Sequence, residues 1–254
     1  MVDAGGLNGS VAIVTGAARG LGRAIALDLA RAGADIGLGL RDAGRDGGLV
    51  DEITALGRRA IPLSMDVTDL DVSRAAIDRV VSELGSVDIL VNNAGGGIMG
   101  DAIDVTEADF DAVWELNTKS TFFLSQHAAK HMRAGNGGAI VNVASQAGLV
   151  ALPGESAYCV SKAAVIHMTR ALAVEWGEYG IRVNAVAPTF IETDGTSEAL
   201  SDPEFLADTI ERIAALHRIG KPVEVGGAVT FLASPAASLI TGQTLAIDGG
   251  WTAR

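Results

Sequence analysis

The chain has little of several features that mark particular classes of protein. Among its 254 residues only Cys159 is a cysteine, so no disulfide can form within the chain, which fits a reducing compartment. Cys159 is expected to be a small apolar packing residue rather than a reactive thiol. No apolar run reaches the length of a membrane span, and the first residues lack the basic and apolar regions of a signal peptide. We therefore expect a cytoplasmic protein.

Positive charge is also scarce. The chain has 31 acidic residues against 19 Lys and Arg, which gives a formal net charge of −12. An acidic surface repels phosphate backbones and anionic lipid headgroups, so neither nucleic acid nor a membrane is expected as a partner. Hydrophobic residues make up 48%, enough for a sizeable core. Because no linker, low-complexity tract or repeat interrupts the chain, residues 1–254 are predicted to form one domain.

Short apolar runs alternate with helical stretches along the chain. Strands are expected at residues 11–15, 35–40, 60–65, 87–91, 139–143, 181–186 and 243–247. Helical stretches are expected at 21–32, 46–58, 68–84, 106–133, after Tyr158, and at 222–233. This alternation predicts an α/β fold with a parallel sheet and helices on both faces. Ligands bind such sheets beyond the carboxyl ends of the strands, which is where the distinctive polar and glycine-rich segments fall.

A glycine turn follows the first predicted strand and opens the first predicted helix. It reads Gly16-Ala17-Ala18-Arg19-Gly20-Leu21-Gly22, a G-x-x-x-G-x-G spacing rather than the more familiar G-x-G-x-x-G. Backbone N–H groups at a helix start carry partial positive charge and bind a pyrophosphate. Glycines let that backbone approach the ligand closely. The position between strand and helix favours dinucleotide binding more than the glycines do alone.

The end of the second predicted strand bears on the choice of dinucleotide. An acidic residue about 20 positions past the glycines typically binds the ribose hydroxyls of NAD. Here Leu40 is followed by Arg41 and Asp42. Arg41, helped by Arg19, can pair with the 2′-phosphate of NADP, so NADP is favoured. The alternative is that Arg41 is a solvated loop residue and that Asp42 binds the ribose of NAD.

Tyr158 and Lys162 are four residues apart in a stretch of good helix formers. This spacing places both side chains on one helix face, one turn apart. A fixed ammonium beside a phenol favours the phenolate, which suits acid/base chemistry near neutral pH. Such a pair also occurs by chance, so its meaning depends on the other motifs.

Taken together, the motifs resemble those of the short-chain dehydrogenase/reductase family over nearly the whole chain. The matching residues, in family order, are Thr15-Gly16-x-x-x-Gly20-x-Gly22, Asp66, Asn92-Asn93-Ala94-Gly95, Asn117, Ser145, Tyr158-x-x-x-Lys162 and Asn184-Ala185-Val186-Ala187-Pro188. The resemblance implies a Rossmann-type sheet of seven parallel strands, a nicotinamide cofactor, and a homotetramer or homodimer. Arg19 and Arg41 are similar to basic residues of the NADP-preferring members.

The resemblance also implies the reaction and four catalytic residues. It implies an oxidoreductase that transfers a hydride between NADP(H), or NAD(H), and a carbonyl or secondary alcohol. Tyr158 would be the general acid or base, and Ser145 would hydrogen-bond the reacting oxygen. Lys162 would hold the nicotinamide ribose and lower the pKa of Tyr158. Asn117 would fix a water that links Lys162 to solvent.

By the same resemblance, one set of positions would hold the cofactor. They are Gly16, Arg19, Gly20, Leu21, Gly22, Arg41, Asp66, Val67, Asn93, Ala94, Gly95, Tyr158, Lys162, Pro188, Ile191 and Thr193. One departure follows Pro188: many members have glycine there, whereas this chain has Thr189-Phe190. The extra bulk would narrow the pocket or add a hydroxyl that binds substrate.

The substrate is expected to meet residues near the catalytic set and a lid. The candidates are Ser145, Gln146, Leu152, Glu155, Thr189 and Phe190. Residues 189–216, here called the lid segment, combine Gly195 and Pro203 with short helical pieces and read as mobile. The polar character of these positions favours a sugar, sugar acid or polyol as the small-molecule substrate. Two alternatives are a 3-oxoacyl thioester reductase and a catalytically silent cofactor-binding regulator. No metal site is expected.

Overall fold

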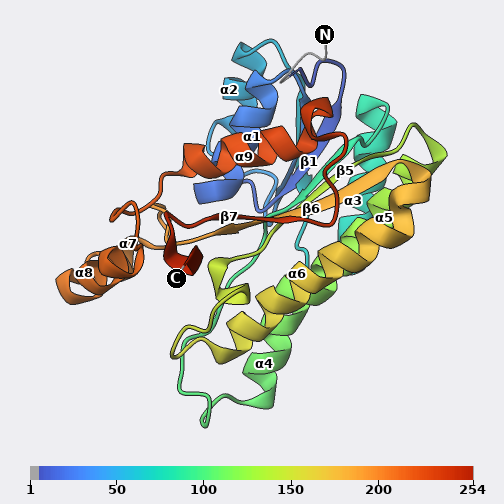
Figure 1. Cartoon of the computed structure of the whole chain (residues 1–254). Helices are drawn as coiled ribbons and strands as arrows, with labels where there is room; N and C mark the ends of the chain where they lie inside the picture. The colour runs from blue at the N-terminus through green and yellow to red at the C-terminus, as the bar shows by residue number, and fades with distance from the viewer. Residues whose placement is uncertain (1–5, 254) are drawn as a thin grey trace.

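A parallel sheet of seven strands runs through the centre of the protein (Figure 1). The computed structural model describes residues 6–253. The strands are β1 (Val11–Thr15), β2 (Asp35–Leu40), β3 (Ala60–Ser64), β4 (Ile89–Asn92), β5 (Gly138–Val143), β6 (Ile181–Pro188) and β7 (Thr244–Ile247). Their order is β3-β2-β1-β4-β5-β6-β7, with parallel register throughout. The chain therefore reverses its direction of growth between β1 and β4, and ligands of open α/β sheets bind at that switch point.

Helices cover both faces of the sheet, as the sequence predicts. One face packs against α1 (Gly20–Arg31), α2 (Leu49–Ala55) and α9 (Pro222–Ala233). The other packs against α3 (Leu70–Leu84), α5 (Ser120–Ala134) and α6 (Ser156–Trp176). Successive strand side chains serve opposite faces: Val14 belongs to the first cluster and Ile13 to the second. The central strands β1, β2, β4 and β5 are consequently buried almost throughout, as a sheet covered on both faces requires.

The remaining helices lie beyond the carboxyl ends of the strands. They are α4 (Glu107–Trp114), α7 (Ser197–Leu200) and α8 (Pro203–Arg212), the last two projecting at the left of Figure 1. Short 3-10 turns lie at Gln146–Gly148, Gly177–Tyr179, Pro235–Ala237 and Trp251–Ala253. Among residues 6–253, no helix has both the length and the apolar character that crossing a membrane would need.

The helical stretch predicted at 106–133 is interrupted in the structure. A π-helical turn, Glu115–Lys119, separates α4 from α5. At its centre Asn117 is buried, and its side chain bonds to Gly96 and to Ser161 of α6. The extra residue in the turn aims the Asn117 amide at these partners, and such turns often mark functional sites.

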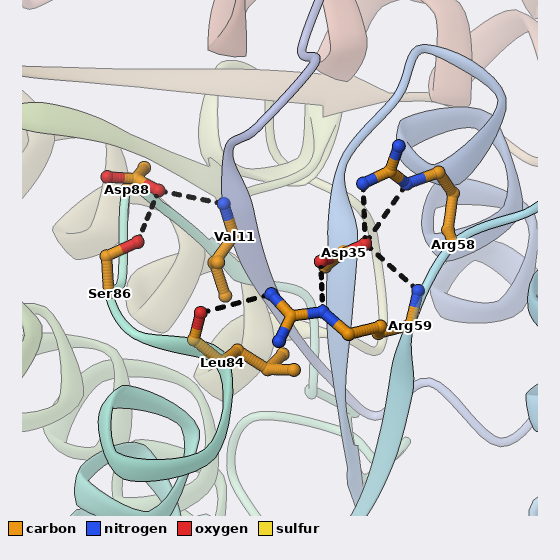
Figure 2. Close-up of polar contacts among 7 residues, drawn as sticks. All are labelled: Val11, Asp35, Arg58, Arg59, Leu84, Ser86 and Asp88. Carbon is orange, nitrogen blue, oxygen red and sulfur yellow. Dashed lines mark hydrogen bonds and ion pairs between the residues drawn. The ribbon is translucent and has the colours of Figure 1, made fainter.

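A network of charged side chains lies at the opposite, amino-terminal edge of the sheet (Figure 2). Asp35, at the start of β2, accepts hydrogen bonds from Arg58 Nη2 (2.8 Å), the Arg59 backbone N (2.9 Å) and Arg59 Nε (2.6 Å). Nearby, Asp88 accepts from the Val11 backbone N and from the Ser86 hydroxyl, each at 2.8 Å. These carboxylates fix the starts of β1 and β2 and leave the carboxyl edge free for other groups.

Candidate active site

The glycine turn leads from β1 into α1 with its backbone exposed to a ligand. Gly16 and Gly20 have left-handed φ angles of +66° and +57°, which only glycine adopts without strain. A Cβ on Gly22 would collide with the Gly16 carbonyl oxygen. The first turn of α1 has no side-chain cap and no acidic residue. Its free N–H groups and close backbone approach therefore fit the pyrophosphate of a dinucleotide.

The residues expected to bind the adenosine end lie at the ends of β2 and β3. Asp66 follows β3, and its carboxylate accepts hydrogen bonds from the Thr68 hydroxyl (2.7 Å) and backbone N (3.0 Å). Those bonds, and to a smaller degree the positive charge of Arg41, hold the pKa of Asp66 below its usual value. Arg41 therefore lies near Asp66, and the adjoining Val67 is buried.

The charge pattern at the end of β2 bears on the alternative reading of Asp42. Asp42 accepts a hydrogen bond from the Gly44 backbone N (2.9 Å) and pairs with Arg45 (3.3 Å). Arg19 and Arg41 are exposed, and within residues 6–253 neither forms an ion pair. The two arginines are thus available to an anion, whereas Asp42 already has partners.

The Asn93–Gly95 run holds the end of β4 against the glycine turn. Asn93 Nδ2 donates to the Thr15 carbonyl oxygen (2.9 Å), and the Thr15 hydroxyl accepts from the backbone N of Asn93 (2.9 Å) and Ala94 (3.0 Å). On the other side, a Cβ on Gly95 would lie 3.1 Å from Lys162 Nζ. The run therefore joins the pyrophosphate site to the Tyr158 helix, α6.

Three catalytic candidates meet where β5 ends and α6 begins. Ser145 follows β5 and caps the next turn, its Oγ accepting from the Ala147 backbone N (3.1 Å). Tyr158 and Lys162 lie in the first two turns of α6, with Lys162 Nζ 5.6 Å from the centre of the Tyr158 ring. Lys162 is buried, and its Nζ donates to the Val143 carbonyl oxygen (2.8 Å).

The pKa values of this pair differ from the expectation that Lys162 lowers that of Tyr158. Burial raises the pKa of Tyr158 to about 12, with the Ser145 hydroxyl opposing the rise and Glu155 and Cys159 adding to it. Burial also lowers the pKa of Lys162 to about 8. In the protein chain by itself burial therefore dominates the ammonium's influence and disfavours the charged form of both groups.

Asn117 joins this group through the π-helical turn. Its Oδ1 accepts from the Gly96 backbone N (3.0 Å), while its Nδ2 donates to the Gly96 carbonyl oxygen (2.8 Å) and the Ser161 hydroxyl (3.0 Å). Asn117 thus braces the glycine loop after β4 against α6. Its side chain is fully engaged in this brace, and the water relay expected from the resemblance remains a prediction.

The expected substrate residues differ in their surroundings. Gln146 is buried with its Oε1 unpaired, and the buried Thr189 hydroxyl is likewise without a partner. Glu155, just before α6, is half-buried, which raises its pKa. Leu152 lies behind this group, its backbone N donating to Cys159 Sγ (3.4 Å). Most buried polar atoms in folded proteins have a hydrogen-bond partner, so these two unpaired atoms call for one.

Phe190 belongs to an aromatic cluster that sequence reasoning missed. Its ring lies 5.4 Å from Phe205 of α8, edge to face, and 6.0 Å from the buried Trp251. The expected cofactor residues Pro188, Ile191 and Thr193 flank it. Ile191 bridges to Gly220, and Thr193 lies 3.5 Å from where a Cβ on Gly20 would be. Leu21, in the first turn of α1, is half-buried.

Comparisons with known proteins find dehydrogenases and reductases. A family model described as enoyl-(acyl carrier protein) reductase matches residues 16–252. The chain is 43% identical to 2-dehydro-3-deoxy-D-gluconate 5-dehydrogenase of Escherichia coli K12, over 100% of both proteins. It is 42% identical to the 3-oxoacyl-[acyl-carrier-protein] reductase FabG of Thermotoga maritima, covering 96% of the chain and 98% of that protein.

A solved structure agrees with the fold. The crystal structure of a gluconate 5-dehydrogenase from Burkholderia cenocepacia J2315, in complex with NADP and tartrate, matches with a TM-score of 0.95. Its identity to the chain is 34%, and the match covers 99% of the chain and 98% of the solved one. The similarity in fold thus extends over nearly the full length of both chains.

Proposed function

The chain belongs to the short-chain dehydrogenase/reductase family, and from this premise we propose that it oxidises a secondary alcohol of a sugar acid or polyol, or reduces the corresponding ketone, preferably with NADP. Its relatives include dehydrogenases that act on CH–OH groups with nicotinamide cofactors.

The chain's own residues divide the chemistry between them. When bound, the nicotinamide cofactor accepts or supplies the hydride. In reduction Tyr158 donates its phenolic proton to the carbonyl oxygen, and in oxidation it removes the proton from the alcohol. Ser145 donates a hydrogen bond to the same oxygen and positions it. Lys162 holds the ribose hydroxyls, and Asn117 keeps the loop after β4 in place against α6.

The observation that carries the substrate class is the unpaired buried polarity of two of the expected substrate residues. Gln146 Oε1 and the Thr189 hydroxyl have no partner in the protein, and an unsatisfied buried polar atom costs about 1–3 kcal/mol. A polyhydroxylated substrate would satisfy both, and Glu155 adds a third acceptor or, if protonated, a donor. A purely apolar ketone would leave these atoms unpaired.

The cofactor preference rests on Arg19 and Arg41. Both are exposed at the carboxyl edge near Asp66, and a guanidinium pairs well with a 2′-phosphate. Asp42, which would bind the ribose diol of NAD, is held by Gly44 and Arg45. The NADP bound to the Burkholderia cenocepacia relative supports the same preference.

The assembly and location belong to the same proposal. We infer a homotetramer or homodimer that acts on a small molecule in the cytoplasm, with the lid segment closing over the site. Light scattering of the purified protein would give the number of chains.

A substrate panel with both cofactors tests the proposal. The panel holds 2-dehydro-3-deoxy-D-gluconate, gluconate, threitol, a bile-acid ketone and an acetoacetyl thioester, with nicotinamide absorbance as the readout. We expect kcat/KM for a sugar acid or polyol to exceed that for the bile-acid ketone by roughly tenfold or more. The mostly apolar bile-acid ketone would leave polar groups of the site unpaired. NADPH or NADP should outperform NADH or NAD.

Three outcomes would contradict parts of the proposal. Turnover of the thioester alone would assign a 3-oxoacyl reductase, although the net charge of −12 is unsuited to an acidic carrier protein. Tight NADPH binding without turnover of any compound would indicate a regulator. Faster turnover with NADH would show that Arg41 does not select the cofactor.

A further inference from the structure

Two histidines of α5 and an aspartate of α3 converge away from the proposed active site. His127 Nε2 and His131 Nε2 each lie 2.7 Å from the same oxygen, Oδ1 of Asp78. His127 lies at the middle of α5, and His131 and Asp78 lie past the middle of their helices, toward the amino-terminal edge of the sheet, since α5 ends at Ala134 and β5 begins at Gly138. Tyr158 and Ser145 lie at the opposite, carboxyl edge. The cluster therefore plays no part in the proposed reaction.

The chemistry of the three groups is that of a zinc site. Two imidazoles and one carboxylate, with a fourth position open to water, form a recurrent Zn²⁺ ligand set. Histidines four residues apart on a helix present both rings on one face, as in helical zinc motifs. Here the rings are edge to face, with centroids 5.3 Å apart and planes at 77°, so both Nε2 atoms point to one place.

The spacing of the ligand atoms is close to what zinc requires. Zinc bonds of about 2.0–2.2 Å at tetrahedral angles put ligand atoms roughly 3.3 Å apart. The nitrogen-to-oxygen distances of 2.7 Å are somewhat shorter, and all three ligand atoms lie within 4.8 Å of one another. Because the Asp78 side chain is 54% exposed, it can turn outward and admit an ion without a shift of either helix.

The exposure of the side chains suits an ion with one water ligand. The His127 side chain is 17% exposed and that of His131 is 31% exposed. The imidazoles are thus held between α3 and α5 while the carboxylate faces solvent, which leaves an entry path and room for water. An ion pair with Asp78 needs only one histidine. A metal ion bound by all three side chains explains why a second histidine is present.

We propose that Asp78, His127 and His131 bind one Zn²⁺ per chain and that the ion fastens α3 to α5. The sequence by itself predicts no metal here, because Asp78 lies 49 residues before His127. The bound ion would stabilise the folded chain by mass action, since the unfolded chain does not hold the three groups together.

The test measures zinc binding by the full-length protein after removal of metals with a chelator. Isothermal titration calorimetry at neutral pH should give one Zn²⁺ per chain, and added Zn²⁺ should raise the unfolding temperature. His127→Ala and His131→Ala should each weaken binding by at least about tenfold, because each removes one of three ligands. The matched control is His167→Ala, which removes an exposed histidine of α6 and should leave binding unchanged.

A conservative variant guards against misfolding. Asp78→Asn keeps a hydrogen-bonding side chain of the same size, and its circular dichroism spectrum should match that of the parent while zinc binding falls by at least about tenfold. Zinc binding that survives all three cluster variants, as it would at Cys159, overturns the proposal. So does a parent protein that binds no zinc, or a loss in His167→Ala as large as that in His131→Ala.

Discussion

At the scale of the residue, burial decides the protonation of the proposed catalytic pair. The pKa of Tyr158 is raised to about 12 and that of Lys162 lowered to about 8, in both cases chiefly by burial. At neutral pH Tyr158 therefore carries its phenolic proton and is ready to act as an acid. Reduction of a ketone needs that form, whereas oxidation of an alcohol needs the phenolate, whose population in the free protein grows with pH.

Tyr158→Phe tests this assignment through both rate and pH dependence. Because a positioned proton donor contributes about 10²- to 10⁴-fold, kcat/KM should fall by that factor. In the parent, kcat/KM for oxidation should rise with pH between about 6 and 10, since deprotonation supplies the base and kcat/KM reports the free enzyme. The variant should lose this rise while NADPH fluorescence titration gives an unchanged Kd. Full activity in the variant would refute the role of Tyr158 in proton transfer.

Sequence patterns located these residues but could not predict their surroundings. The Tyr158-x-x-x-Lys162 spacing and the strand before Ser145 place three groups at one edge of the sheet without further information. The direction of the Tyr158 pKa shift was wrongly predicted because it depends on burial, which the spacing does not reveal. The hydrogen bond from Lys162 to Val143, 19 residues away, likewise arises only when β5 packs on α6.

At the scale of the element, the predicted strand bounds agree with the structure to within about two residues. The interruption between α4 and α5 was not predicted. The strand positions follow from short apolar runs bounded by polar residues, a local signal. The π-helical turn at Glu115–Lys119 is stabilised by contacts of Asn117 with Gly96 and Ser161, which lie 21 and 44 residues away. A local sequence pattern cannot predict contacts between residues so far apart in the chain. The contacts of Asp78 with His127 and His131 could not be predicted for the same reason.

The start of β2 depends on the Asp35 network of Figure 2. Burial alone would raise the pKa of Asp35, but hydrogen bonds from Arg59 and Arg58 outweigh it and hold the pKa below its usual value. Asp35→Ala should lower the free energy of unfolding by about 1–3 kcal/mol, because it leaves the half-buried Arg58 side chain and the Arg59 backbone N without their hydrogen-bond acceptor. Urea denaturation followed by circular dichroism measures this.

The pH dependence of that difference gives a second measurement of the same variant. A carboxyl whose folded-state pKa is depressed stabilises the fold above its unfolded pKa, about 3.9, and loses that effect as pH falls through the folded value. The difference between parent and Asp35→Ala should therefore be constant from about pH 5 to 8 and shrink below about pH 4. Asp71→Ala, which breaks an exposed pair with Arg74, should change stability by less than about 0.5 kcal/mol. Equal decreases in the free energy of unfolding in the two variants would show that the Asp35 network stabilises the fold no more than an exposed ion pair does.

At the scale of the whole molecule, residues near both ends of the lid segment contact the C-terminal turn at residues 248–252. At its start, Phe190 contacts Trp251. Past its helix α8, the backbone N of Ala215 and of Leu216 donate to the Gly249 carbonyl oxygen at 3.1 Å and 3.0 Å. The turn itself is fixed by Asp248, whose carboxylate accepts from the backbone N of Gly250 and Thr252. Residues near both ends of the lid thus share one anchor, so we expect the segment between them to move as a unit.

Phe205 of α8 joins the middle of the lid segment to this anchor, because its ring meets Phe190 edge to face at 5.4 Å. Such a pair contributes about 0.5–1.5 kcal/mol beyond burial. Phe205→Ala should therefore raise the substrate KM about two- to tenfold and speed protease cleavage within residues 192–212, while the unfolding temperature of the sheet changes little. Phe231→Ala, an exposed phenylalanine of α9, is the control for loss of a ring away from the lid. If KM and cleavage in Phe205→Ala match those of the control, the lid is held by the Gly249 hydrogen bonds alone, and the aromatic cluster serves only to pack the C-terminal turn.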